Sequence, residues 1–400
     1  MLGGALEVGL VLLGTGPLLI TAYLLFLTGA ALFGRRQVGR TGQGVRRFAV
    51  LVPAHNEQVL IGRLLDNLRG LDYPVSNFEV WVVADNCDDA TASIARKRGA
   101  HVLERFDSDD RAKGFALRWL LEQLGLRGQR FDAYVVLDAD SVVSPNFLKS
   151  MDARLDAGSQ VIQAYYSVLN AHESPLASLR YAALAAVHYV RPLGRAVVGL
   201  STGLKGNGMC FSAGVLERFP WRWFTLAEDV EFHLALVRGG VRVDFAPEAR
   251  VLADMPITLA QAGSQNARWE RGRLALLKRA VPELLLLAAR RRSLLIFDAG
   301  LEQIIPPQSV SLGWSALSFG LAVVLNVHTA AVVGGLSLLG QSIYLIAALL
   351  LVRAPLRAYS ALVYAPVYLM WKVGIYVRAL VVPESGRWVR TARTTPPGTV

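Results

Sequence analysis

The hydrophobic positions of this chain gather at its two ends, while shorter apolar runs punctuate the middle. Val8 to Phe33 contains no charged residue and is long enough to span a bilayer as a helix. A second apolar block begins near Pro306. Within it, Ser309–Val327 and Thr329–Val352 are predicted to form two further spans. The pattern therefore predicts a membrane protein with a soluble domain in its middle.

A third apolar stretch near the C-terminus, Ala358–Val382, is interrupted by Lys372 and Arg378. It is either another span or an interfacial helix whose basic side chains reach lipid headgroups. The first span is followed by basic residues, namely Arg35, Arg36, Arg40, Arg46 and Arg47. The positive-inside rule then leaves the N-terminus outside and the soluble domain in the cytoplasm. Basic residues in the tail favour a cytoplasmic C-terminus, which would make Ala358–Val382 interfacial or re-entrant.

The middle of the chain alternates apolar runs of strand length with helical patterns. The predicted strands are Phe48–Pro53, Phe78–Ala84, His101–Glu104, Ala133–Leu137 and Val161–Val168. The predicted helices are Glu57–Leu71, Asp88–Arg98 and Ala112–Leu124. Such alternation is typical of a Rossmann-like, mostly parallel sheet with helices on both faces. We therefore expect an α/β domain between N-terminal and C-terminal membrane helices.

The composition agrees with a soluble domain between membrane helices, and it limits the kinds of ligand and macromolecule that the protein is expected to bind. The chain is 53% apolar and carries a formal net charge of +11. Membrane topology accounts for such a charge, and a basic surface would also suit an anionic lipid or a diphosphate. No basic stripe interleaved with aromatic residues is present, so we expect no nucleic-acid partner. The two cysteines, Cys87 and Cys210, have no metal-type spacing and indicate no disulfide framework.

Acidic residues stand at the predicted strand ends. Asp85 ends one strand, and Asp138 and Asp140 end another. Ligands of open α/β sheets bind beyond the carboxyl ends of the strands, and Mg²⁺ or Mn²⁺ held by carboxylates is commonly shared with substrate phosphates. The first strand is followed by Pro53-Ala54-His55-Asn56-Glu57 instead of a glycine-rich phosphate loop. A bound nucleotide would therefore rely on a metal and on basic side chains.

Three further positions carry candidate chemistry, each beside a structural alternative. Asp229 opens a helix-like segment and is either a general base for an acceptor hydroxyl or a first-turn acid. Lys113 precedes a helix and could equally be a solvated side chain. Gln265, Arg268 and Trp269 share one helical face. Arg268 could neutralise a leaving diphosphate and Trp269 could stack on a sugar, or the segment is an interfacial helix.

The ordered series of motifs resembles the membrane-bound family 2 glycosyltransferases, the group of cellulose, chitin and hyaluronan synthases. The series is Pro53-Ala54-His55-Asn56-Glu57, Asp85, Lys113-Gly114, Asp138-Ala139-Asp140, Glu228-Asp229 and Gln265-Asn266-Ala267-Arg268-Trp269. The resemblance covers roughly Phe48 to Arg273. It implies a GT-A fold and a metal-dependent, inverting hexosyl transfer from a nucleotide-diphosphate sugar, with a UDP-sugar favoured.

The resemblance also implies roles for individual residues. His55, Asn56, Glu57 and Asp85 would line the nucleoside pocket, and Lys113 would contact the nucleotide. Asp138 and Asp140 would hold the diphosphate through Mg²⁺ or Mn²⁺, and Asp229 beside Glu228 would be the base. Gln265, Arg268 and Trp269 would form the Q-x-x-R-W element at the acceptor entrance. Gly206 and Asn207 would belong to an acceptor-side strand whose glycines allow a sugar to approach the backbone.

The acceptor remains open between two classes. A saccharide acceptor in polysaccharide synthesis is the leading interpretation, and transfer of one sugar to a polyprenyl phosphate or another lipid is the alternative. Q-x-x-R-W suggests processive synthesis, whereas three or four spans are few for a polymer channel. An oligomer or an export partner could complete such a channel. A catalytically inactive scaffold that binds nucleotide sugars is a third reading, which the intact set of carboxylates argues against.

These interpretations divide the chain into five parts. They are a membrane helix over 1–34, a cytoplasmic GT-A domain over 45–257, and the Q-x-x-R-W segment with amphipathic helices over 258–305. Transmembrane or interfacial helices over 306–383 and a cytoplasmic tail over 384–400 complete the division. Within the third part we expect one amphipathic helix, Pro282–Phe297, on the cytoplasmic leaflet. The protein is thus expected to be a multi-pass protein of the cell membrane that contacts lipids.

Overall fold

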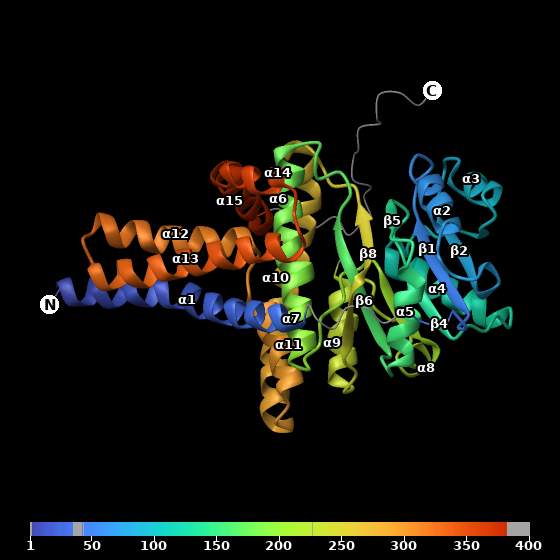
Figure 1. Cartoon of the computed structure of the whole chain (residues 1–400), viewed down its shortest axis with the longest axis horizontal. Coiled ribbons are helices and arrows are strands. Elements are labelled where there is room, and N and C mark those ends of the chain that lie inside the picture. Colours follow the sequence, from blue (N-terminus) through green and yellow to red (C-terminus); the bar gives the residue numbers. More distant parts are fainter. Residues whose placement is uncertain (1, 35–41, 43, 226, 382–400) are drawn as a thin grey trace.

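The computed structural model describes residues 2–34, 42, 44–225 and 227–381 (Figure 1). The side chains of residues 2–3, 264–265, 268–269 and 376–381 lie outside that description. Along its longest axis the molecule has three parts. A bundle of apolar helices forms one end, a layer of connecting helices lies in the middle, and an α/β sheet forms the other end.

The sheet has eight strands in the order β3-β2-β1-β4-β7-β6-β8-β5. Their bounds are β1 Phe48–Ala54, β2 Phe78–Asp85, β3 His101–Arg105, β4 Ala133–Val136, β5 Ser141–Val143, β6 Val161–Val168, β7 Met209–Ser212 and β8 Val243–Ala253. All five predicted strands are confirmed within one residue at each end. Strands β3, β2, β1 and β4 run parallel, as expected. Strand β7 is antiparallel to both β4 and β6, so the sheet is mixed.

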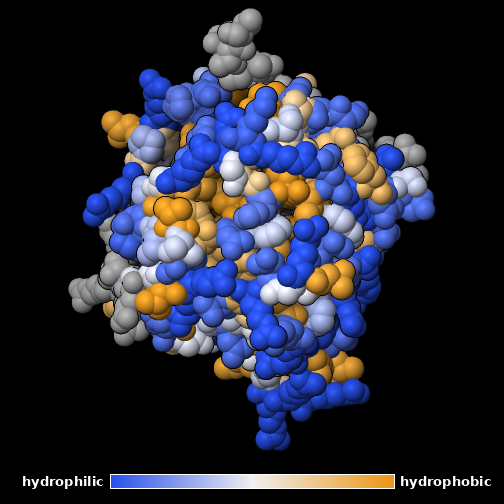
Figure 2. Space-filling view, turned by 90° about the vertical axis from the view of Figure 1, so that its right-hand side faces the viewer, coloured by the Kyte–Doolittle hydropathy of each residue, from blue (hydrophilic) through white to orange (hydrophobic). Residues whose placement is uncertain are grey.

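Helices cover both faces of the sheet because side chains alternate between the faces along each strand. Val50 and Val52 pack with the core of α2 (Ile61–Arg69) and α5 (Phe147–Asp156). Ala49 and Leu51 point to the other face, toward α4 (Lys113–Leu126) and α9 (Glu228–Arg238). The remaining helices of this domain are α3 Thr91–Lys97 and α8 Ala213–Arg218. The end of the sheet domain seen in Figure 2 is mostly hydrophilic.

A layer of helices joins the sheet to the bundle. Its members are α6 Pro175–Leu184, a π-helical turn Ala185–Val190, α7 Arg191–Val197, α10 Leu259–Arg291 and α11 Leu294–Ile304. The prediction of one helix over Pro282–Phe297 is wrong. Arg292 adopts a left-handed conformation (φ 49°) that ends α10, and the Ser293 side chain caps the start of α11. Leu284 is fully buried against α9 and α11, because this face of α10 belongs to the protein core.

The bundle consists of α1 (Leu2–Gly34), α12 (Gln308–Val324) and α13 (His328–Leu351). Among the described residues, two helices, Gly4–Gly34 and His328–Leu351, are long and apolar enough to cross a membrane, and α12 is shorter. Thirty-three residues of α1 extend about 50 Å, which exceeds the roughly 30 Å of a hydrocarbon core. Its C-terminal end therefore reaches the layer of connecting helices, where Gly194 of α7 allows close contact with the Leu27 carbonyl.

The three bundle helices pack directly on one another. A side-chain carbon at Gly334 would lie 2.8 Å from the backbone of Phe319, and one at Gly340 would meet Thr21. Ser337 accepts or donates hydrogen bonds with both Thr21 (3.2 Å) and Ser315 (2.8 Å). Small residues and interhelical hydrogen bonds are what hold helices together when the surrounding solvent is apolar.

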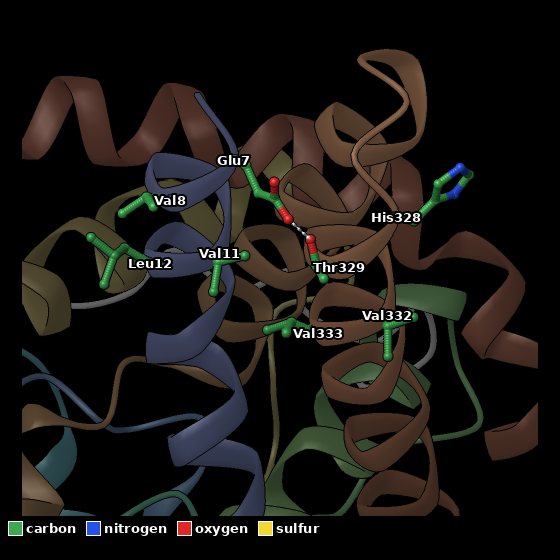
Figure 3. A pocket seen from close by; sticks show the side chains of 8 residues that line it. All are labelled: Glu7, Val8, Val11, Leu12, His328, Thr329, Val332 and Val333. Atoms are coloured by element: carbon green, nitrogen blue, oxygen red, sulfur yellow. Dashed lines mark hydrogen bonds between the residues drawn. The ribbon is translucent and has the colours of Figure 1, made fainter. Parts of the chain in front are cut away.

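A shallow groove marks the outer tip of the bundle, where α1 and α13 meet (Figure 3). Thr329 donates a hydrogen bond to Glu7 there, and four valines, Leu12 and His328 line the remainder. The C-terminal stretch after the bundle is divided into α14 (Leu356–Ser360), a 3-10 turn Ala361–Tyr364 and α15 (Ala365–Val381). Lys372 of α15 is buried, and its ammonium lies 3.1 Å from Glu270 of α10. The tail, 384–400, lies outside the described residues.

Candidate active site

The carboxyl ends of β1, β2 and β4 meet at one edge of the sheet and bring the predicted polar residues together. Asp138 follows β4, and His55 follows β1, the neighbouring strand. Lys113 begins α4 and reaches across to Asp138, with 2.5 Å between the ammonium and the carboxylate oxygen. The same ammonium donates a hydrogen bond to the Gly206 carbonyl. Lys113 therefore ties the end of β4 to the loop before β7.

Asn207 joins the loop before β7 to the segment that follows β4. Its side-chain oxygen accepts a hydrogen bond from the Asp138 backbone N–H (3.1 Å), and its amide donates to Ser141 (2.8 Å). The Asn207 side chain is fully buried. Gly206 and Gly208 on either side have positive φ angles (75° and 68°), a conformation that glycine adopts at no steric cost. Asn207 is thus a structural anchor of the site as well as a candidate for substrate contact.

Two acids at the start of α9 face this loop. A side-chain carbon built on Gly206 would lie 3.3 Å from Asp229 Oδ2, so the backbone there approaches the carboxylate closely. Glu228 and Asp229 occupy the first turn of α9, as predicted. Burial, followed by the charge of Asp229, raises the pKa of Glu228 to about 7. Burial also raises the pKa of Asp229, although backbone N–H groups and two lysines act in the opposite direction.

The nearby acids also change the pKa of Lys113. Burial alone would lower its pKa, but the carboxylates of Asp138 and Glu228 outweigh that effect and raise it. Asp138, Glu228 and Asp229 therefore outnumber the two lysines, Lys113 and Lys205, whose charges act on this group, which leaves an excess of negative charge. A cation at this place would relieve the repulsion.

A second set of residues is organised around the end of β2. Asp85 is 1% exposed and forms a 2.6 Å ion pair with Arg105, whose side chain is 6% exposed. The backbone oxygen of Asp85 lies 2.8 Å from His55 Nδ1. Arg105 also contacts Asp107, and its partner role went unnoticed in the sequence because nothing in the local pattern distinguishes it from a surface arginine.

Backbone N–H groups of the loop after β1 donate hydrogen bonds to side chains in the segment between β2 and the start of α3. The Asn56 N–H donates to Cys87 Sγ and the Glu57 N–H donates to Thr91 Oγ1. Asn56 adopts a positive φ of 55°, and its side chain accepts from the backbone of Asp88. The predicted nucleoside-pocket residues His55, Asn56, Glu57 and Asp85 are therefore neighbours in space.

The proposed metal ligands, Asp138 and Asp140, suit a divalent cation whose remaining ligands come from the substrate. Asp140 is two residues beyond Asp138, and its backbone carbonyl accepts a hydrogen bond from Arg63. Among the described residues, no three His, Cys, Asp or Glu side chains gather closely enough to hold an ion by themselves. Mg²⁺ and Mn²⁺ are commonly held by one or two carboxylates together with substrate phosphates. Asp138 and Asp140, beside an excess of negative charge, suit that mode of binding.

The Q-x-x-R-W element lies on the backbone of α10, which confirms its helical prediction. The side chains of Gln265, Arg268 and Trp269 lie outside the described residues, so their contribution remains a prediction. Glu270, the next residue, is buried between Arg273 and Lys372, at 3.1 Å from each. The helix that carries this element is therefore clamped to α15 by a buried ion pair.

An α/β sheet with this strand order, with acidic groups at its carboxyl edge, defines a domain of the GT-A type. Residues 46–272 match the family described as "Glycosyltransferase like family 2". This match spans more than half of the chain, and the chain belongs to that family.

Individual relatives are distant. The chain is 24% identical to the probable glycosyltransferase YdaM of Bacillus subtilis over 261 residues, 63% of this chain and 60% of that protein. It is 27% identical to a beta-monoglucosyldiacylglycerol synthase of Trichormus variabilis over 236 residues, 56% of this chain and 48% of that protein. The chain thus spans about half to three fifths of the length of these curated relatives.

One solved structure shows the same fold over most of the chain. It is the mannosyltransferase PcManGT from Pyrobaculum calidifontis in complex with GDP-Man and Mn²⁺. The likeness covers 84% of this chain and 98% of that one, with a TM-score of 0.51 and 19% sequence identity. At this identity the likeness establishes the fold, and the chemistry of this chain has to be argued from its own residues.

Proposed function

We propose that this protein transfers a hexose from a nucleotide-diphosphate sugar to an acceptor hydroxyl at the cytoplasmic face of a membrane, with inversion at the anomeric carbon. The observation that carries the proposal is the convergence of Lys113, Asp138 and Asp229 around the Gly206 backbone. The Lys113 ammonium, paired with Asp138, contacts the Gly206 carbonyl, and the Asp229 carboxylate approaches the same residue. Lys113 would bind the donor phosphates, and Asp229 would face the acceptor hydroxyl. A group transfer between an anionic leaving group and a hydroxyl nucleophile requires both.

The reaction is a single displacement. The acceptor oxygen forms a bond to the anomeric carbon while the bond from that carbon to the diphosphate oxygen breaks. Asp229 accepts the hydroxyl proton, which is a role for a carboxylate within hydrogen-bond reach. The nucleotide diphosphate leaves from the opposite face, and one displacement inverts the centre. Lys113 would contact the departing phosphates from its position on Asp138.

Asp138 and Asp140 would hold Mg²⁺ or Mn²⁺ together with the donor diphosphate. The ion would supply positive charge where negative charge develops on the leaving group. His55, Asn56, Glu57 and Asp85 would bind the nucleoside, and Arg105 would keep Asp85 in place. Gln265, Arg268 and Trp269 on α10 would stand at the acceptor side.

A lipid hydroxyl, or a saccharide carried on a lipid, is the acceptor class that the architecture supports best. The apolar helices α1, α12 and α13 pack directly on one another and join the sheet domain through α7 and α11. Such packing holds the site at a membrane surface, where a lipid acceptor is present. The name of the Trichormus relative, a beta-monoglucosyldiacylglycerol synthase, points the same way. A growing polysaccharide is the second candidate, favoured by the Q-x-x-R-W element.

Nucleotide release by the detergent-purified protein tests the donor half of the proposal. We expect release with one member of a panel of UDP- and GDP-sugars in the presence of Mn²⁺ or Mg²⁺, and its loss with EDTA. Asp138→Asn should behave like EDTA treatment, whereas Asp72→Asn, an exposed carboxylate paired with Lys149, should behave like the parent. Release that is indifferent to EDTA and to Asp138→Asn would contradict the metal role.

The acceptor half is tested with the same preparation in lipid nanodiscs. A single glycolipid formed from added diacylglycerol would support the lipid acceptor, and a ladder of sugar products would support the polysaccharide. The absence of donor binding by calorimetry, with and without metal, would overturn the enzyme proposal itself.

A further inference from the structure

A buried group of charged and phenolic side chains joins the sheet domain to the membrane helices, and the reaction as described makes no use of it. Its members, which we call the interhelix ion cluster, are Tyr23 of α1, Arg191 and Arg195 of α7, Asp298 and Glu302 of α11, and Tyr344 of α13. Arg195, only 1% exposed, lies at the centre and bonds Asp298 at 2.9 Å, Glu302 and the Tyr23 hydroxyl. Three helices, α1, α7 and α11, therefore meet on the Arg195 guanidinium group, and Arg191 adds α13 by donating to the Tyr344 hydroxyl at 3.0 Å.

The opposite charges in this cluster stabilise one another and offset the cost of burial. Burial alone would raise the pKa of Glu302, but Arg195 and Arg191 lower it to about 2. Burial is likewise outweighed at Arg195, where Glu302 and Asp298 raise the pKa. Glu302 is therefore a firmly ionised carboxylate inside the protein.

Lys205 extends the cluster toward the candidate active site. Its ammonium lies 3.9 Å from Glu302 Oε1, and its side chain is 14% exposed. Its backbone N–H donates to Gln163 Oε1 at 2.9 Å, which fixes the loop that contains it. The next residue, Gly206, is the one whose backbone approaches Asp229. Lys205 is thus paired with Glu302 of α11 and is the chain neighbour of the residue whose backbone approaches Asp229.

The charges around these two groups come from several elements. Lys113 of α4 and Lys205 both lower the pKa of Asp229, against the effect of burial. The charge of Asp229 acts in turn on Glu228, its neighbour on α9. Lys205 is influenced by burial, which lowers its pKa, and then by Glu302, Arg195, Arg191 and Asp229. The nearby imidazoles of His188 and His233 are neutral at physiological pH, because burial and Lys205 lower the pKa of each to about 3.

We propose that Lys205 is a positioning residue that favours the ionised form of Asp229 from the side of the site that faces the helix bundle, and that Glu302 holds Lys205 in place. The proposal rests on the function proposed above only in naming Asp229 as the base. Lys113 stabilises the donor side of the acidic group through Asp138, and Lys205 stabilises the acceptor side. In this arrangement the membrane helices are connected to the base through Tyr23, Arg195, Glu302 and Lys205.

The test is the pH profile of kcat/KM for nucleotide release by Lys205→Met. Loss of a neighbouring positive charge makes the Asp229 carboxylate harder to ionise, so the acidic limb should move to higher pH by about one unit or more. Donor affinity by calorimetry should change less than about twofold, and Lys205→Arg should restore the parent limb. Lys149→Met, which removes a half-buried lysine paired with the exposed Asp72 outside the candidate site, is the matched control and should leave the profile unchanged.

Glu302→Gln tests the second half of the proposal. Without this carboxylate the Lys205 ammonium loses its proton more readily, so the alkaline limb should move to lower pH. In the double variant with Lys205→Met this effect on the alkaline limb should vanish, because Glu302 acts through Lys205. An alkaline shift that persists in the double variant would overturn the role of Glu302.

A direct readout separates this inference from the proposed function. Titration of Asp229 followed by ¹³C NMR of aspartate-labelled protein, assigned with Asp229→Asn, needs no substrate. The Asp229 signal should titrate at higher pH in Lys205→Met than in the parent, even if no donor is turned over. An unchanged Asp229 titration, or a kcat/KM loss of equal size at every pH, would reduce Lys205 to a structural residue and overturn the inference.

Discussion

Gly114 of α4 lies so close to Trp223 that a side-chain carbon there would stand 2.1 Å from the Trp223 carbonyl oxygen. This contact brings the first turn of α4, which carries Lys113, against the loop that leads to Glu228 and Asp229. Trp223 itself stacks on Phe232 of α9, with ring centroids 4.3 Å apart. The donor side and the base side of the candidate site are therefore joined at one backbone contact.

Gly114→Ala should push these two segments apart. We expect a loss of about 1–3 kcal/mol in the free energy of unfolding, the size of an overpacking change, together with reduced turnover. Gly125→Ala is a matched control in the same helix, because its added carbon meets nothing within 4 Å. That variant should be neutral or stabilising by up to about 1 kcal/mol. Equal stability of the two variants in denaturant unfolding would argue against the contact.

Asp229→Asn should abolish most turnover while leaving donor binding intact. The asparagine keeps the shape of the side chain but cannot accept the acceptor proton, so kcat should fall by about 10²- to 10⁴-fold or more. Donor affinity, measured by calorimetry, should stay near that of the parent because the donor ligands lie on the other side of the site. Near-normal turnover would remove Asp229 from the role of base.

Glu228 should make the metal-free protein less stable as pH rises. Its pKa is raised from 4.5 to about 7 in the folded state, so the stability that it contributes is present below pH 4.5 and is lost as pH rises through 7. Glu228→Gln should therefore be more stable than the parent at pH 8 by about 1–3 kcal/mol, and similar to it at pH 4.5. Unfolding in EDTA at the two pH values measures this. Glu122→Gln, an exposed carboxylate, should show no such difference from the parent.

Arg105→Leu should destabilise the fold because it leaves Asp85 buried without its ion pair. Removing one partner of a buried pair typically costs about 3–5 kcal/mol. Arg96→Ala is the comparison, since the Arg96–Glu104 pair joins side chains that are 51% and 36% exposed. Such surface pairs contribute about 0–1 kcal/mol. A loss at Arg105 as small as the loss at Arg96 would show that Asp85 tolerates isolation.

The alternation of apolar runs with helical patterns was enough to predict β1 to β4 and β6 nearly to the residue. It also placed Asp85 and Asp138 at the ends of parallel strands, but the expectation that these strands are adjacent was wrong, because β1 lies between β2 and β4. The helix over Pro282–Phe297 was wrong, because the left-handed turn at Arg292 depends on the packing of α11 against α10. Lys205 and Arg105 escaped notice, since a lone basic residue in a sequence does not reveal a buried partner. Arg191 with Arg195, and Asp298 with Glu302, do share the spacing of one helical face.

The sequence by itself determined whether each segment is a strand, a helix or an apolar membrane-length helix. Burial of one face imposes a hydrophobic period on every strand and helix, and that period can be read locally along the chain. The sequence also determined which residue types were available for metal, phosphate and proton chemistry. Only the tertiary structure decided that Gly206 approaches Asp229, that Asp85 is held by Arg105 and that Arg195 joins three helices. Those relationships link positions between 20 and 172 residues apart in the chain. They depend on how the elements pack, since a close contact between buried charges exists only when the whole fold removes both from water.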